Sequence, residues 1–94
     1  MPVEIVWSPL ARQRLREIRE YVAKDKPGAA EKLAVRIVAA VQALRKYPHI
    51  GRAGPDPEIR ELVIGKTPYI VPYKIGSSVV TINTIWHAAQ KRGP

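Results

Sequence analysis

Three β-strand patterns in the last third of the chain constrain its fold more than any other feature. Runs rich in Val, Ile and Tyr, which favour strands, cover residues 59–64, 69–75 and 79–86. The connections between them contain Gly, Pro or Ser and are short enough to join antiparallel neighbours. Pro72 lacks a backbone N–H, so we expect a bulge or an irregular stretch in the middle strand. The pattern predicts a small antiparallel sheet.

One strand and two helices are predicted before this sheet. Residues 3–7 alternate as a short strand does. Ser8 and Pro9 mark a helix start, because serine accepts an unpaired backbone N–H and proline has none to leave unpaired. Apolar stripes at helical spacing then predict helices over residues 9–24 and 28–45. The glycines and prolines of residues 49–57 predict a loop before the sheet.

The order β-α-α-β-β-β predicts an α+β fold, in which a helical hairpin packs on one face of the antiparallel sheet. Its 94 residues correspond to one domain, residues 1–94. Hydrophobic residues make up 46% of the chain, which excludes a disordered tail. No cysteine is present, which excludes disulfides and Cys-ligated metals.

The charge balance indicates an acidic partner. Sixteen Lys and Arg stand against eight Asp and Glu, a net charge of +8. Nucleic acid, an anionic membrane and an acidic protein all fit this charge. The first predicted helix carries four arginines: Arg12, Arg14, Arg16 and Arg19. They either form a solvated helix face or make a patch that binds phosphate or an acidic partner. No signal segment or membrane-spanning apolar run is recognised, so we expect a cytoplasmic protein without a membrane partner.

Metal and cofactor motifs are absent from the sequence. His49 and His87 are far apart, and neither has a Cys or carboxylate at ligand spacing. No glycine-rich run has the form of a phosphate loop that leads into a helix. We therefore predict no metal and no cofactor.

Basic, tyrosine and histidine side chains on the predicted sheet allow two interpretations. A cleft of Arg and Lys with Tyr and His could stabilise phosphoryl charge and move a proton, as metal-free RNA cleavage requires. Alternatively, Arg60 pairs with Glu58 or Glu61, and Tyr69 and Tyr73 are core aromatics with their hydroxyls at the rim. The cations involved are Arg52, Arg60, Lys66, Lys74, Lys91 and Arg92.

Several short motifs gain specificity from their joint order and spacing. They include Ser8-Pro9 with Ala11, Leu15 and Ile18; Arg60-Glu61-Leu62; Tyr69-Ile70-Val71-Pro72-Tyr73; and His87-x-x-Gln90. In these motifs nearly the whole chain resembles the RelE/ParE superfamily of type II toxin–antitoxin toxins. The resemblance implies the same element order and a growth-inhibiting toxin that a cognate, acidic antitoxin neutralises.

The resemblance also implies one of two targets. RelE-like members cleave mRNA in the ribosome, whereas ParE-like members poison DNA gyrase and are not nucleases. RNA-cleaving members usually carry an arginine where this chain has Ile70, and no tyrosine follows Lys91 and Arg92. We therefore favour gyrase as the target. There are two alternatives: a ribosome-dependent mRNA endoribonuclease, and a degenerate toxin that retains only antitoxin binding.

Each interpretation has its own candidate residues. For nuclease chemistry the catalytic candidates are His87, Arg60 and Arg52. For target or antitoxin binding the candidates are Arg60, Tyr69, Tyr73, His87, Lys91 and Arg92.

Overall fold

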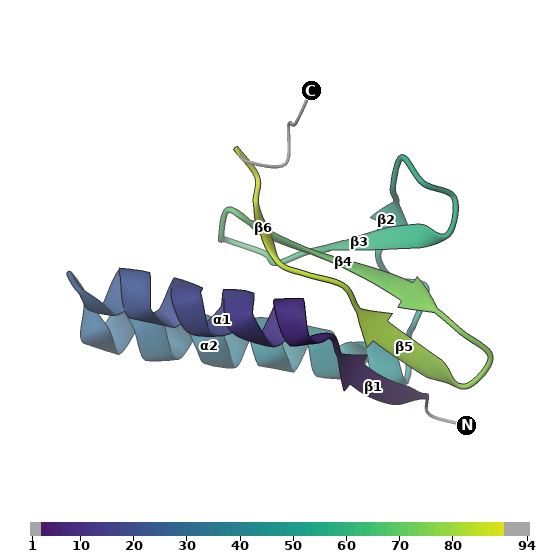
Figure 1. Ribbon diagram of the computed structural model, residues 1–94, viewed down its shortest axis with the longest axis horizontal. Coiled ribbons are helices and arrows are strands. Elements are labelled where there is room, and N and C mark those ends of the chain that lie inside the picture. The colour runs from purple at the N-terminus through teal and green to yellow at the C-terminus, as the bar shows by residue number, and fades with distance from the viewer. Residues whose placement is uncertain (1–2, 90–94) are drawn as a thin grey trace.

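The computed structural model describes residues 3–89, in which a helical hairpin covers one face of a small sheet (Figure 1). The first strand and the helical hairpin are β1 (Glu4–Trp7), α1 (Pro9–Ala23) and α2 (Pro27–Gln42), which a short 3-10 turn continues as η1 (Ala43–Arg45). The remaining strands are β2 (Arg52–Ala53), β3 (Ile59–Val63), β4 (Tyr69–Ile75), β5 (Val79–Ile82) and β6 (Trp86–His87). Neither α1 nor α2 is long and apolar enough to cross a membrane.

The predicted start of α1 is confirmed, and its cap also joins the helix to the sheet. The Ser8 hydroxyl oxygen accepts the backbone N–H of Ala11 at 3.0 Å. The same hydroxyl donates to the backbone oxygen of Asn83 at 2.7 Å, and Asn83 directly follows β5. The Ser8 side chain therefore pairs with a backbone N–H that has no partner within the helix, and it fixes the first turn of α1 against the end of β5.

The sheet is mixed: the antiparallel pairing expected of the three late strands is confirmed, but β1 adds a parallel pair that the prediction of an antiparallel sheet did not include. Its strand order is β1-β5-β4-β3-β2, and β6 also pairs with β4. Strand β1 runs parallel to β5. Parallel partners need a long connection, and the chain between these two strands includes the whole hairpin. The predicted loop of residues 49–57 also contains β2, a two-residue strand that pairs with β3.

The irregularity expected in the middle strand lies on its neighbour instead. Strand β4 keeps continuous register with β3 past Pro72. On its other side, Ile82 pairs with Tyr73 and Trp86 pairs with Ile70. The three residues 83–85 therefore stand opposite only two residues of β4, Val71 and Pro72. The oxygen of Pro72 accepts the N–H of Asn83 at 3.0 Å, but proline has no N–H to donate in return. The predicted strand of residues 79–86 is therefore divided into β5 and β6.

The two faces of the sheet differ in what covers them. On the helix-facing side, Tyr69, Val71 and Tyr73 join the core with residues of both helices. Ile70 and Pro72 alternate with them and lie on the opposite side, which we call the helix-distal face. Because three residues stand opposite two, His87 aligns with Tyr69 on the helix-facing side, while Trp86 aligns with Ile70.

Candidate functional site

The candidate residues predicted from sequence form two groups at opposite ends of β4. Tyr69 lies at one end and pairs with His87. Tyr73 lies four residues further on, about 13 Å along the strand, and pairs with Arg60. Lys91 and Arg92 lie outside the described residues. The structure therefore brings each tyrosine to one basic candidate, but does not bring all the candidates together.

Tyr69 and His87 form an edge-to-face ring pair. Their ring centroids are 5.5 Å apart and their planes meet at 85°. Nδ1 of His87 accepts the backbone N–H of Ala89 at 3.2 Å, so Nε2 is the ring nitrogen that this bond leaves open. Tyr69 is buried, and this burial raises the pKa of its hydroxyl. His87 is therefore held in one orientation, with a single nitrogen available to a ligand or a partner.

A groove of about 560 Å³ opens between this ring pair and α1, and we call it the His87 groove. Arg14, Glu17 and Tyr21 lie on its α1 side. Arg14 Nη1 lies 3.0 Å from Glu17 Oε1. The hydrogen bond from Gln13, with that from Arg14, holds the pKa of the Glu17 carboxyl below its ordinary value. The groove thus combines exposed aromatic surface with an ionised pair.

The α1 side of this groove is not among the residues predicted from sequence. Arg14, Glu17 and Tyr21 follow one another at spacings of three and four, which places them on one side of a helix. That spacing is visible in the sequence. The position of the helix relative to His87 is not, because it depends on the interruption between β5 and β6.

Tyr73 and Arg60 hold a loop in place. The Tyr73 hydroxyl donates to the oxygen of Pro48 at 2.6 Å and accepts the N–H of Gly51 at 2.9 Å. Arg60 Nη1 donates to the oxygens of Gly51 at 2.6 Å and His49 at 3.3 Å. Tyr73 is completely buried, and burial raises the pKa of its hydroxyl. Both tyrosines are core aromatics, as one of the two interpretations expected, but the Tyr73 hydroxyl is buried under this loop and not at the rim.

The expected ion pairs of Arg60 are wrong, because other cations take those carboxylates. Lys74 Nζ lies 3.0 Å from Glu58 Oε1, and Arg52 Nε lies 3.2 Å from Glu61 Oε1. Glu61 is only 2% exposed. Arg52 and Arg60 therefore both stabilise the region around the loop and β3, and both lie away from His87.

With this geometry established, comparison with known proteins identifies the family. The model of the ParE toxins of type II toxin–antitoxin systems matches residues 5–92. The chain belongs to this ParE toxin family.

Two relatives agree with this membership. The chain is 47% identical to the candidate toxin Y4kP of Sinorhizobium fredii over 93% of its own length and 90% of the relative. It is 36% identical to toxin RelE2 of Caulobacter vibrioides, over 93% and 97% of the two chains. The second relative thus carries a RelE name, whereas the family model that matches the chain describes ParE toxins.

The solved structures confirm the fold. A chain of the chromosomal ParDE system of P. aeruginosa matches with a TM-score of 0.83 and 23% identity, covering 90% of this chain and 95% of that one. A chain of the RelBE2 complex of Mycobacterium tuberculosis matches with a TM-score of 0.64 and 16% identity, over 93% and 99%.

In this ParE-family toxin, Ile70 lies among buried side chains on the helix-distal face. Ile70 is 5% exposed, and Pro72 beside it on the helix-distal face is completely buried. The buried carboxylate of Glu61 aligns with Pro72 on the same face. Among residues 3–89, no group of three or more His, Cys, Asp or Glu side chains could hold a metal ion.

Proposed function

We propose that this toxin inhibits growth by binding DNA gyrase, and that an acidic cognate antitoxin neutralises it. The observation that carries the proposal is the environment of Ile70 on the helix-distal face. A transition-state phosphate requires a cationic or hydrogen-bonding group aimed at it. At this position it would instead meet an isoleucine, a proline and the side of β3 that carries the Glu61 carboxylate.

The placement of the other cations supports the same proposal. Arg60 Nη1 is engaged by two loop carbonyls, and Arg52 lies against Glu61. Both arginines belong to the end of the sheet that holds Tyr73, whereas His87 lies beside Tyr69 at the other end. A general acid and its phosphate-binding arginines must reach the same reacting group. His87, Arg60 and Arg52 do not meet this requirement.

The His87 groove is the surface that we assign to gyrase. Tyr and Arg are the residue types that most often dominate the energy of a protein–protein interface. Tyr21 and Arg14 supply both types from α1, and Tyr69 and His87 supply the opposite wall. Two sides of rigid secondary structure thus present aromatic and charged groups to a protein partner.

The antitoxin part of the proposal is supported by charge and by the solved relatives. A net charge of +8 on 94 residues favours association with an acidic protein. The two solved relatives belong to a ParDE toxin–antitoxin system and a RelBE2 toxin–antitoxin complex. An acidic antitoxin encoded beside this toxin is the partner that fits both observations.

The test is a gyrase supercoiling assay with purified toxin, combined with induction of the toxin in cells. We expect inhibited supercoiling, trapped cleaved DNA and a DNA-damage response. The double variant Tyr21→Ala/Arg14→Ala should lose the inhibition and keep its fold by circular dichroism. Val63→Ala, a change on the far side of the sheet, is the matched control. Intact gyrase activity at excess wild-type toxin would refute the proposal.

A second candidate function, ribosome-dependent mRNA cleavage, is favoured by one observation. His87 lines the same groove as Arg14 and Glu17, so an imidazole, a guanidinium and a carboxylate are close to one another. Primer extension on translated messages would then reveal cuts at codon positions, and His87→Ala would abolish them. Harmless expression of the free toxin would instead favour a degenerate toxin that only binds its antitoxin.

A further inference from the structure

A polar groove of about 580 Å³ lies at the end of the sheet where β3 begins beside the end of β4 (Figure 1). Three parts of the chain line it: the loop after η1, the start of β3 and the end of β4. We call it the Arg60 groove, and its lining residues are His49, Pro57, Glu58, Arg60, Lys74 and Ile75. Most of these side chains are charged or titratable, which suits a charged ligand better than an apolar one.

Arg60 is held in place and still has hydrogen-bond donors to spare. Its Nη1 donates to the backbone oxygens of His49 and Gly51. A guanidinium has five N–H donors, of which three are on Nε and Nη2. Within residues 3–89 these two nitrogens form no hydrogen bond and no ion pair. Because two carbonyls already hold the guanidinium, binding a ligand would require little further ordering of this side chain.

Lys74 shows that an oxyanion fits in this groove. Its Nζ lies 3.0 Å from Oε1 of Glu58. The two side chains are 55% and 69% exposed, and an ion pair this exposed contributes little to stability. An incoming anion can therefore replace the Glu58 carboxylate without a large loss. In the free protein this carboxylate occupies the place of a ligand oxygen.

His49 adds a donor from the third part of the chain, because an imidazole carries at least one N–H whether it is neutral or charged. Arginine and lysine together are the side chains that most often contact phosphate oxygens. We propose that the Arg60 groove binds one phosphate group of a DNA backbone. The inference rests on the proposed function, because DNA is the polymer that gyrase holds.

A phosphate fits this groove better than an acidic protein segment does. Protein interfaces depend on a buried apolar or aromatic centre. Pro57 and Ile75 are the only apolar side chains among the described lining residues, and Pro57 is exposed. Phosphate contacts, in contrast, are made by charged and polar groups alone. The net charge of +8 adds a long-range attraction to DNA.

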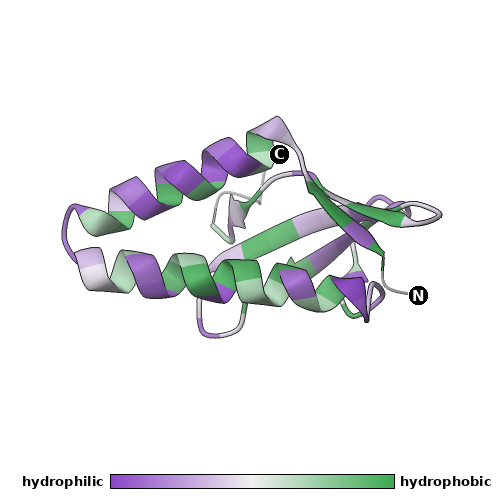
Figure 2. Ribbon diagram, turned by 90° about the horizontal axis from the view of Figure 1, so that it is seen from below, coloured by the Kyte–Doolittle hydropathy of each residue, from purple (hydrophilic) through white to green (hydrophobic). Residues whose placement is uncertain are grey.

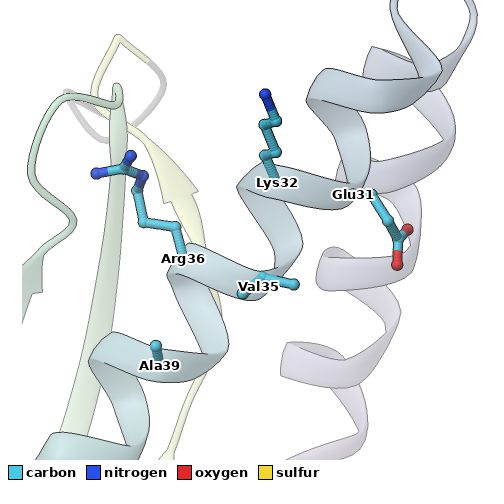
Figure 3. Close-up of a pocket in the computed structure, with 5 residues that line it drawn as sticks. All are labelled: Glu31, Lys32, Val35, Arg36 and Ala39. Carbon is cyan, nitrogen blue, oxygen red and sulfur yellow. The ribbon is translucent and has the colours of Figure 1, made fainter.

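The exposed cations of the helices are arranged differently. Hydrophilic residues are spread along both helices in Figure 2. Lys32 and Arg36 line a groove of about 530 Å³ whose described lining residues all belong to α2. Figure 3 shows both side chains projecting from this one helix. They therefore lack the second and third walls of the Arg60 groove, and Lys32 is a suitable control residue.

The Arg60 groove is separate from the His87 groove. Lys74 follows Tyr69 by five residues, about 16 Å along β4. No described residue lines both grooves. DNA binding can be measured without gyrase, so its failure would leave the proposed target untouched. Conversely, a toxin that binds DNA through this groove but does not inhibit gyrase would refute the target alone.

The experiment measures fluorescence anisotropy of a short labelled DNA duplex with the purified toxin, at salt concentrations between about 50 and 200 mM. We expect the wild type to bind and Lys74→Gln to weaken binding about three- to tenfold. Lys74→Gln should also reduce the slope of log affinity against log salt by about one, as the loss of one phosphate contact does. Lys32→Gln removes the same charge from α2 and should leave the slope unchanged. No binding by the wild type, or equal losses in the two variants, would overturn the proposal.

Glu58→Gln tests the site in the opposite direction. It removes the carboxylate that competes for Lys74, so the affinity for the duplex should rise about two- to fivefold. Glu31→Gln is the matched control, because it releases Arg19 from a similarly exposed pair and should have a smaller effect. Circular dichroism verifies the fold of each variant. An affinity that Glu58→Gln leaves unchanged or lowers would contradict the site.

Further comparisons identify the source of the phosphate. Potassium phosphate and potassium chloride at equal ionic strength should displace the duplex equally, because a free phosphate lacks the neighbouring contacts of a polymer. Stronger displacement by inorganic phosphate would assign the groove to a small phosphorylated ligand and overturn the proposal. Tighter binding of a single-stranded RNA, or of a glutamate-rich peptide, with the same dependence on Lys74 would overturn it as well.

Discussion

Arg60 and Tyr73 stand opposite each other in β3 and β4, and their side chains hold the same loop. The guanidinium donates to the oxygen of Gly51, and the phenol accepts the N–H of that glycine. The sequence makes both residues candidates for a binding or catalytic site. Their hydrogen bonds give them a structural role in this loop, which leads to the first three predictions.

Tyr73→Phe should destabilise the fold, because it leaves the oxygen of Pro48 and the N–H of Gly51 without their buried partner. An unsatisfied buried polar group costs about 1–3 kcal/mol. For a domain of this size each kcal/mol corresponds to a melting-temperature decrease of about 4–8 °C. Thermal denaturation measures the change. Tyr47→Phe, at an exposed tyrosine, should have almost no effect.

Stability should fall at high pH because burial raises the pKa of Tyr69 and Tyr73. In the unfolded chain these phenols ionise near pH 10, while in the folded chain they keep their protons to higher pH. The unfolded state then binds fewer protons, so the free energy of unfolding decreases as pH rises above about 10. Urea denaturation between about pH 8 and 11 should show a shallower decrease for Tyr73→Phe. An unchanged slope in that variant would contradict the assignment.

Gly51→Ala should be destabilising because Tyr73 occupies the space that the new methyl group needs. An added Cβ would lie 2.6 Å from both the ring edge and the hydroxyl oxygen of Tyr73. Overpacking at such a site costs about 1–3 kcal/mol. Gly65→Ala is the matched control, since no atom beyond its chain neighbours lies within 4 Å of the place that its new Cβ would occupy. Chemical denaturation of the two variants should separate them clearly, and equal stability would disprove the predicted clash.

Ile70→Arg should not create a nuclease and should destabilise the fold. The new guanidinium would replace a side chain that is 5% exposed and lies beside the buried Pro72. Burying an unpaired charge is among the most costly single changes, and we expect a loss of more than about 3 kcal/mol. Val63→Arg lies directly opposite in β3 and is 49% exposed, so it should be tolerated. A stable Ile70→Arg variant that cleaves mRNA would refute this prediction.

Local sequence patterns predicted the elements better than their pairing. The range of β4 matches its prediction, and the cap at Ser8 begins α1 as expected. The parallel pairing of β1 with β5 was missed because a strand pattern does not specify its partner. Strand β2 was missed because two residues are too short to produce a periodic pattern.

The candidate site was predicted only in part, for the same reason. The sequence places His87 near the end of the sheet and suggests Tyr69 as a further candidate, and the two rings do lie together. The sequence does not show that Arg14, Glu17 and Tyr21 lie near His87, because contacts between α1 and β6 depend on three-dimensional packing. The expected ion pairs of Arg60 were wrong because its partners are backbone carbonyls, which leave no mark in the sequence.

The single surplus residue between β5 and β6 has a consequence for how such a chain can change over time. Side chains of a strand alternate in direction, so the surplus residue after Ile82 must be absorbed for His87 to stand opposite Tyr69. Losing one codon in the segment 83–85 would leave two residues opposite two, so β5 would continue into β6 in one regular register. Trp86 would still stand opposite Ile70 and His87 opposite Tyr69. A one-residue deletion could thus straighten this edge of the sheet and leave both surfaces of this toxin in place.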